Sequence, residues 1–131
     1  RVAAFHRASA ADLTLGLFST LAPHKFGMVE LDQQGRVHYF VDKPVNSHLR
    51  YMWGLAAWSP RFSRLLAGFL AGVPTGGREV VLSDAFQAAL HAGLEVQSLV
   101  LDPAHYHDIG TPEDFQAVVY DLALQQAQAI E

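Results

Sequence analysis

The stretch DLTLGLFST, residues 12–20, decides the fold class because it is rich in β-forming residues and is apolar at both odd and even positions. A strand that is apolar on both faces is typical of the inner part of a sheet covered by helices. We therefore expect residues 12–20 to form a strand deep in a sheet. Such a strand needs neighbours on both sides, so we expect part of the sheet to be absent from this chain or to come from another segment.

Helical and strand patterns alternate on both sides of this strand. Residues 2–9 resemble the end of a helix, and FGMVELDQQGRVHYFVDKP predicts a hairpin with strands at 28–31 and 37–41 and a turn at 32–35. The interleaving predicts an α/β fold, in which helices pack on a layered mixed sheet. The other expected elements are strands at 51–60 and 94–102, and helices at 60–71, at 83–91 with Ser83 or Asp84 as cap and Gly93 as stop, and from Pro112 to near the end.

The composition fits one domain and excludes several classes of function. The chain has 131 residues, half of them hydrophobic, and a net charge of −4 with nine scattered Lys and Arg, so we expect no nucleic-acid partner. It has no cysteine, which fits a cytoplasmic location, and no apolar run near the roughly 20 residues of a membrane helix. Because the sequence begins with Arg1 and not with Met, we expect it to be a piece of a longer protein.

Two positions in the predicted hairpin are candidates for ligand binding. Lys43 follows Asp42 at a strand end, where its ammonium group could hold a phosphate. The alternative is a charged hairpin end that Pro44 closes. Gly27 opens the preceding strand, where it would let a ligand approach the backbone, although a turn glycine fits as well.

The segment AHYHDIGTPEDF, residues 104–115, carries the other candidate. Thr111 and the residues after it have the pattern of a helix start, which leaves Asp108 unexplained at an expected strand end. A zinc site is disfavoured because His105 and His107 would share one face of a strand while Asp108 lies on the other. Magnesium on Asp108 fits better, because it needs few carboxylates and accepts phosphate ligands.

Taken in order, FGMVELDQQGRVHYFVDKP, MWGLAAWSP, REVVLSDAFQAAL and HYHDIGTPEDFQAV resemble the sugar-1-phosphate nucleotidyltransferases, most of all the glucose-1-phosphate thymidylyltransferase type. The resemblance covers about residues 2–119. It implies that residues 1–131 are the sugar-phosphate-binding C-terminal half of a nucleotide-diphospho-sugar transferase fold, which is Rossmann-like. The nucleotide-binding N-terminal half, with its Gly-rich loop and first metal aspartate, would be absent.

The resemblance also assigns roles to single residues. Gly27 would offer its backbone to the sugar, Asp42 would bond sugar hydroxyls, and Lys43 would hold the sugar phosphate and act as the catalytic residue. Gly54 would lie close under the sugar or ribose. The remaining implied assignments are Glu79 as a substrate-binding residue, or otherwise only part of a helix cap with Asp84, and Asp108 as a ligand of the catalytic Mg²⁺.

The implied reaction joins a nucleoside triphosphate and a sugar 1-phosphate into a nucleoside-diphosphate sugar and pyrophosphate. This chain alone is expected to be inactive, and its incomplete sheet is expected to favour self-association or a homo-oligomer. Two departures, Asp42 for the family's Glu and Phe26 for its Tyr, leave open a degenerate subunit that binds sugar nucleotides without catalysis. An α/β interaction module without a ligand is the other alternative.

Overall fold

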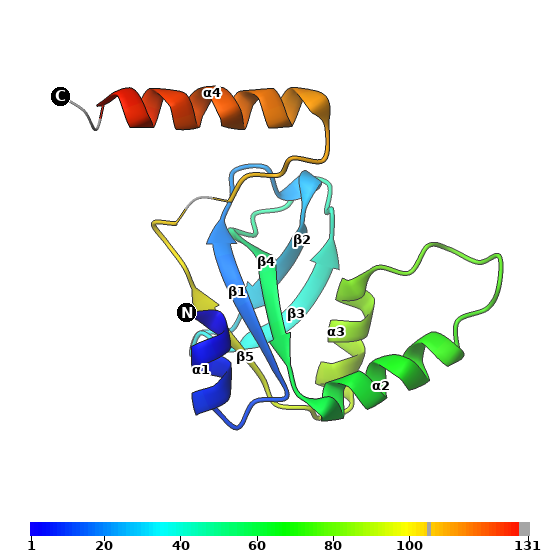
Figure 1. The fold of residues 1–131 in the computed structure, drawn as a ribbon. Coiled ribbons are helices and arrows are strands. Elements are labelled where there is room, and N and C mark those ends of the chain that lie inside the picture. The colour runs from blue at the N-terminus through cyan, green and yellow to red at the C-terminus, as the bar shows by residue number, and fades with distance from the viewer. Residues whose placement is uncertain (105, 129–131) are drawn as a thin grey trace.

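A five-stranded mixed sheet forms the centre of the computed structural model, which describes residues 1–104 and 106–128 (Figure 1). The inner strand β1 pairs antiparallel with β4 and parallel with β5, so the expected strand within residues 12–20 is confirmed. The strands are β1 (Leu13–Ser19), β2 (Gly27–Leu31), β3 (Val37–Asp42), β4 (Tyr51–Trp58) and β5 (Val96–Val100), in the spatial order β3-β2-β4-β1-β5.

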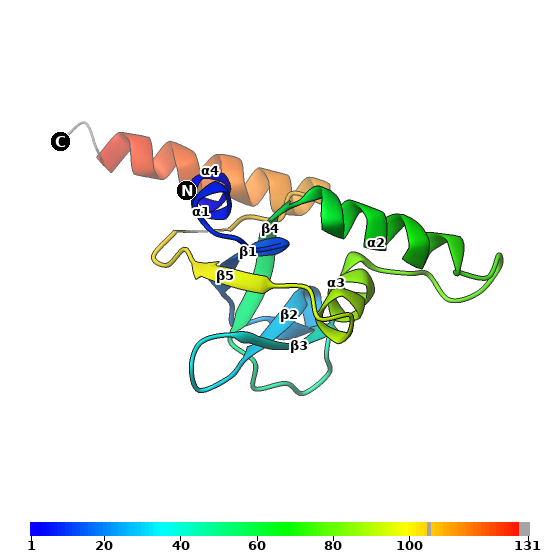
Figure 2. The same cartoon turned by 90° about the horizontal axis from the view of Figure 1, so that it is seen from below.

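Helices cover both faces of this sheet, which makes the fold α/β as predicted. The two views of the ribbon show α2 and α3 grouped together, away from α1 (Figures 1 and 2). No described helix has the length and apolar character that crossing a membrane requires, within residues 1–104 and 106–128. The helices are α1 (Val2–Ala8), the short 3-10 turn η1 (Pro23–Lys25), α2 (Pro60–Ala71), α3 (Leu82–His91) and α4 (Pro112–Gln128).

An aromatic core lies between the sheet and helices α2 and α3. The ring of Phe86 on α3 is fully buried, and its centroid lies 5.1 Å from that of Trp53, 5.6 Å from Phe40 and 5.7 Å from Phe62. Aromatic pairs at such distances stabilise beyond the area that they bury. This core holds α3 and the strands beneath it in one place.

A smaller core lies on the opposite face of the sheet, under α1. Val2, Phe18, Met28 and Met52 are buried together there. The helix is also tied to β1 by a hydrogen bond of 2.9 Å between His6 Nδ1 and Thr14 Oγ1. The two cores therefore occupy opposite faces of the same strands, as an inner sheet with apolar residues at odd and even positions requires.

The segment after β5 is largely exposed. None of the α4 residues that the structure describes is buried, and this helix lies across one end of the sheet (Figure 1). The predicted strand 94–102 is shorter than expected, because β5 ends at Val100 and a turn follows in which the Ala104 amide donates to the Leu101 carbonyl at 2.8 Å. Pro103 has no amide hydrogen to continue strand pairing.

The cap of α3 also differs from the prediction. The helix begins at Leu82 with Val81 as its N-cap, so neither Ser83 nor Asp84 occupies the cap position. The Asp84 carboxylate accepts a hydrogen bond from the Val81 amide at 3.2 Å and pairs with Arg78 at 2.8 Å, so it satisfies the helix start from inside the first turn. Gly93, at φ +71°, follows the end of the helix as expected.

Candidate functional site

The structure brings three of the predicted ligand-binding residues together at one corner of the sheet. Gly27, the first residue of β2, lies directly opposite Asp42, the last residue of β3. The next residue, Lys43, donates its amide to the Phe26 carbonyl at 2.9 Å. Residues opposite each other on antiparallel strands share one face, so Gly27 and Asp42 face the same side. We call Gly27, Asp42 and Lys43 the phosphate corner.

Lys43 leaves the strand in an unusual backbone conformation. Its φ is +44°, in the left-handed region that few residues other than glycine adopt. The residue is exposed, while Asp42 beside it is half-buried. A backbone held in such a conformation at a strand end is a reason to suspect a functional position.

Gly27 is required by the packing behind the corner. A Cβ atom at this position would lie 2.4 Å from Trp53 Nε1 and 2.9 Å from Ser83 Oγ. These two atoms bond to each other, since the indole N–H donates to the Ser83 hydroxyl at 2.9 Å. Ser83 is therefore not the helix cap that the sequence predicts, but a hydrogen-bond partner of Trp53. The two in fact form the wall behind Gly27.

Gly54 faces the other side of the sheet, because it follows Trp53 on β4 and side chains alternate along a strand. A Cβ atom on Gly54 would lie 2.8 Å from Cδ2 of Tyr106, so an aromatic ring already fills the space over this glycine. The structure therefore does not bring Gly54 to the same face as Gly27. The predicted sugar contact of Gly54 stays a prediction.

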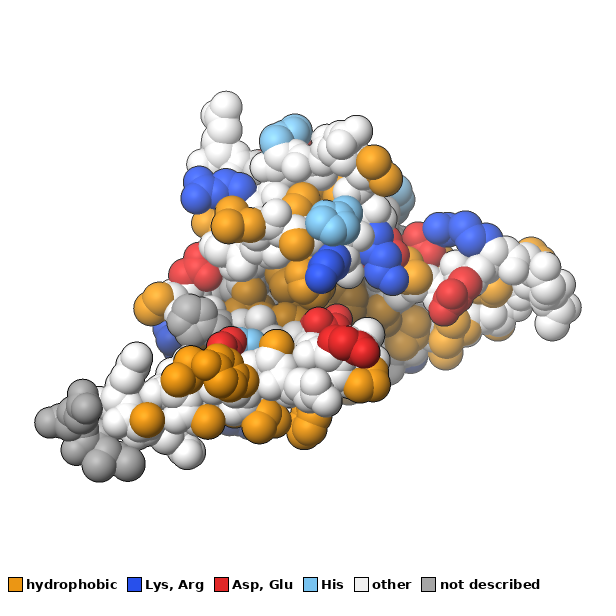
Figure 3. Space-filling view, turned by 90° about the horizontal axis from the view of Figure 1, so that it is seen from above, with side chains coloured by type: hydrophobic (Ala, Val, Ile, Leu, Met, Phe, Trp, Pro, Cys, Tyr) orange, Lys and Arg blue, Asp and Glu red, His pale blue; other side chains and the backbone are white. Residues whose placement is uncertain are grey.

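Asp108 lies apart from this corner and lines a cavity of about 220 Å³ that we call the Asp108 cavity. Figure 3 shows a hollow between α4 and the rest of the molecule, with acidic side chains on the α4 side and basic ones across from them. The lining is mixed: Lys25, His107, Asp108 and Asp114 are its charged or polar residues, and Phe26, Tyr106, Ala117 and Val118 its apolar ones.

The prediction that Asp108 ends a strand is wrong. The residue is exposed in the loop after β5, and its Oδ1 accepts a hydrogen bond from the Gly110 amide at 3.1 Å. Phe26 joins the two places, because it lines the Asp108 cavity and its carbonyl accepts from Lys43 in the phosphate corner. His105, part of the rejected zinc pattern, lies outside the described residues.

The oxygen donors around Asp108 suit a hard cation. Carboxylates of Asp108 and Asp114 line one exposed cavity, and Mg²⁺ is commonly held by one or two carboxylates with water and phosphate as its other ligands. Within residues 1–104 and 106–128 no three His, Asp or Glu side chains gather in a way that would hold a metal alone. Asp108 and Asp114 therefore fit Mg²⁺ as a partial set of ligands.

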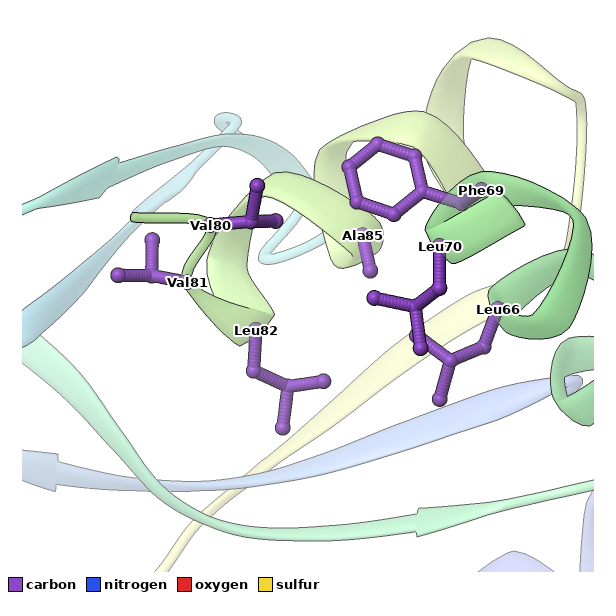
Figure 4. Close-up of a pocket in the computed structure, with 7 residues that line it drawn as sticks. All are labelled: Leu66, Phe69, Leu70, Val80, Val81, Leu82 and Ala85. Atoms are coloured by element: carbon purple, nitrogen blue, oxygen red, sulfur yellow. The ribbon is translucent and has the colours of Figure 1, made fainter. Parts of the chain in front are cut away.

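Glu79, the remaining predicted site residue, is exposed in the loop between α2 and α3. The residues after it border a cavity of about 260 Å³ between these helices, whose side chains point toward one another (Figure 4). Every lining residue is apolar, so this cavity offers nothing that would recognise a phosphate or a sugar hydroxyl. The lining consists of Leu66, Phe69, Leu70, Val80, Val81, Leu82 and Ala85.

Comparisons with known proteins place these observations in a family context. The family model described as nucleotidyl transferase matches residues 1–125. The mannose-1-phosphate guanylyltransferase of Mycobacterium tuberculosis (strain ATCC 25618 / H37Rv) is 30% identical over 126 residues, which cover 90% of this chain and 31% of that protein. The chain thus spans about a third of the length of this curated relative.

Two solved structures share the fold. One, described as a glucose-1-phosphate thymidylyltransferase from Bacillus anthracis in complex with a sucrose, superposes with a TM-score of 0.72 at 16% identity and covers 88% of this chain and 45% of that one. The other, the inositol-1-phosphate CTP transferase from T. maritima, gives a TM-score of 0.67 at 18% identity, with coverage of 87% and 45%. At these identities the likeness concerns the fold alone.

Proposed function

Because this chain belongs to the nucleotidyl transferase family, we propose that it forms the sugar-phosphate-binding part of a sugar-1-phosphate nucleotidyltransferase. The reaction would convert a nucleoside triphosphate and a sugar 1-phosphate into a nucleoside-diphosphate sugar and pyrophosphate. The chain spans 31% of its curated relative, so we further propose that the triphosphate is bound mainly by residues that this sequence does not include. On its own the chain would then be inactive.

The phosphate corner is the observation that supports this proposal most directly. Its exposed Lys43 supplies a cation for phosphate, and the adjacent Asp42 supplies oxygen atoms that accept hydrogen bonds from hydroxyl groups. Gly27 is half-buried at the same strand end, and the Trp53 and Ser83 side chains pack into the space that its missing side chain leaves. A cation and a hydrogen-bond acceptor at one strand end suit a small phosphorylated polyol.

In the proposed reaction an oxygen of the sugar phosphate attacks the α-phosphorus of the triphosphate. The new bond joins that oxygen to phosphorus, and the bond to the departing pyrophosphate breaks. Lys43 would orient the attacking phosphate and neutralise part of its charge. Asp108, with Asp114 in the same cavity, would hold Mg²⁺, which stabilises charge on the transferred group when it is bound.

The proposal is tested by replacing Lys43 in the intact protein and measuring pyrophosphate release and sugar-phosphate binding. A charge-assisted hydrogen bond contributes about 1.5–3 kcal/mol, so Lys43→Ala should weaken sugar-phosphate binding roughly tenfold to a hundredfold while nucleotide binding is retained. Lys43→Arg should recover part of the loss. Arg64→Ala is the matched control, because Arg64 is a basic residue on the exposed surface of α2.

An unchanged Michaelis constant and an unchanged rate in Lys43→Ala would remove the assignment of the corner.

The degenerate subunit is the second candidate, and the packing of Phe26 favours it. Its ring lies edge-on to Tyr106 at a centroid distance of 6.0 Å and carries no hydroxyl for a ligand. That subunit would bind sugar phosphate through Lys43 and release no pyrophosphate.

An interaction module without a ligand would neither bind sugar phosphate nor release pyrophosphate, and it would purify with a partner chain. Self-association stays a prediction, and it would use the open side of β5 at one edge of the sheet. The cytoplasmic location also stays a prediction.

A further inference from the structure

The ring of Tyr106 occupies a seat on the sheet that three residues form. Its centroid lies 5.4 Å from that of Phe18 and 6.0 Å from that of Phe26, and its edge lies over Gly54. Phe18 is buried in the core under α1, so the seat belongs to the rigid part of the fold. Tyr106 therefore connects the exposed segment after β5 to that core.

The seat depends on the absence of a side chain at position 54. A Cβ atom there would lie 2.8 Å from Cδ2 and 2.9 Å from Cε2 of Tyr106, closer than carbon atoms pack in folded proteins. Gly54 is not among the glycines with positive φ, so its backbone conformation does not demand glycine. Because Cε2 of Phe18 would also lie 2.9 Å from that Cβ atom, space for the rings of Tyr106 and Phe18 is the physical reason for glycine at this position.

The other contacts described for residues 102–104 and 106–111 lie near the two ends of the segment. At its start the Asp102 carboxylate accepts hydrogen bonds from the amide and the hydroxyl of Ser19. At its end the Thr111 hydroxyl caps α4 by accepting from the Asp114 amide at 3.1 Å. The Asp108 carboxylate bonds within the segment itself, to the Gly110 amide. Between the two ends, the described contact with the sheet is the ring of Tyr106.

We propose that Gly54 and Tyr106 are positioning residues for Asp108. Two residues of chain span at most about 7 Å, so the place of the Tyr106 ring limits where the Asp108 carboxylate can lie. The side chains of Tyr106 and Asp108 both line the Asp108 cavity. The inference rests on the proposed function, because it concerns the carboxylate that we expect to hold the metal. It gives Gly54 a role that needs no contact with the sugar.

Four variants of the intact protein separate this role from a general loss of stability. Gly54→Ala adds the carbon that displaces the ring, and Tyr106→Ala removes the ring from an exposed residue without cutting into the core. Tyr106→Phe keeps the ring. In the double variant Gly54→Ala/Tyr106→Ala the added carbon no longer meets Tyr106, although it still lies 2.9 Å from Cε2 of Phe18, so its effect on the segment should be smaller than in the single variant. Gly68→Ala is the control, because no atom lies within 4 Å of its added carbon.

Two readouts are needed. Hydrogen–deuterium exchange of residues 101–111, without any ligand, reports on the seat, and exchange should be several-fold faster in Gly54→Ala and Tyr106→Ala but not in Tyr106→Phe. Electron paramagnetic resonance with Mn²⁺ in place of Mg²⁺ reports on metal affinity. A misplaced ligand should weaken it roughly tenfold to a hundredfold, toward the value of Asp108→Asn. Sugar-phosphate binding in EDTA should not change.

The outcomes test the seat of Tyr106 and the metal role of Asp108 separately. Unchanged exchange in Gly54→Ala and in Tyr106→Ala would overturn the seat, whatever the activity. Exchange could be faster in these variants while the Mn²⁺ affinity is unchanged in them and in Asp108→Asn. That result would confirm the seat of Tyr106 but show that Asp108 does not bind the metal, so the positioning role would be wrong as well. Weaker sugar-phosphate binding in EDTA would show that Tyr106 contacts the sugar and does not position Asp108.

Discussion

The phosphate corner and the Asp108 cavity meet at Phe26, yet they are held in different ways. The corner is backed by Trp53, whose ring packs at 5.1 Å against the buried Phe86 and whose N–H bonds to Ser83. Asp108 lies instead in a loop of exposed residues that leads into a helix with no buried side chain among those described. The proposed phosphate site is thus backed by the buried core, whereas the proposed metal ligand depends on a few local contacts.

The largest effect should come from emptying the core behind the corner. Phe86→Ala removes a fully buried ring with three aromatic neighbours and should lower the free energy of unfolding by about 3–5 kcal/mol. Phe115→Ala, on the 54% exposed ring in α4, should change it by no more than about 0.5 kcal/mol. Urea denaturation of both variants checks this. Equal losses would mean that α4 is packed as firmly as α3.

A middle-sized effect is expected at the wall of the corner. Ser83→Ala leaves the Trp53 N–H without its acceptor, which should lower the free energy of unfolding by about 1–3 kcal/mol. Ser63→Ala, at an exposed position of α2, is the control. Thermal melting measures the stability, and tryptophan fluorescence in a Trp58→Phe background reports the change around Trp53. A stability like that of the control would show that the corner does not rely on this wall.

The smallest effect is a pH dependence of the segment that carries Asp108. The Ser19 hydroxyl and then the Ser19 amide, by bonding to the Asp102 carboxylate, hold its pKa below the ordinary value of 3.8. A depressed pKa means that the charged form stabilises the folded segment above pH 3.8, and that this contribution is lost as the pH falls through the lowered value.

Exchange of residues 101–111, followed from pH 5 downward, should therefore become faster on acidification than intrinsic exchange alone predicts. Asp102→Asn should flatten this dependence. Asp32 also has a lowered pKa, chiefly because the Arg36 amide bonds to it, but it lies in the turn between β2 and β3. Asp32→Asn should leave exchange of residues 101–111 unchanged, and a change there would mean that Asp102 is not the group responsible.

Much of the fold follows from local pattern. Residues 12–20 have apolar side chains at odd and even positions because β1 contacts both cores. Asp32 and Gly35 mark the hairpin turn. The corner was predictable in part, since Gly27, Asp42 and Lys43 lie at the ends of two strands joined by a short turn. Such positions come together whatever the rest of the chain does.

The parts that sequence could not supply depend on distant contacts. Ser83 is a residue type that often caps helices, but its hydroxyl accepts a hydrogen bond from the indole N–H of Trp53, thirty residues earlier. The sequence predicts a strand over residues 94–102, yet pairing with β1 ends at Val100. The family resemblance assigns Gly54 a ligand contact, and only the fold shows that the ring of Tyr106 fills the space beside this glycine.

The parallel pairing of β1 with β5 has a consequence for the synthesis of the protein. Leu13 pairs with Val96, 83 residues later in the sequence, while its other neighbour, β4, follows much sooner. At a translation rate of about 5–20 residues per second, one side of β1 waits roughly 4 to 17 s for its partner to leave the ribosome. During that time an apolar strand presents unpaired amides and carbonyls to other chains, which makes it a site where aggregation can begin.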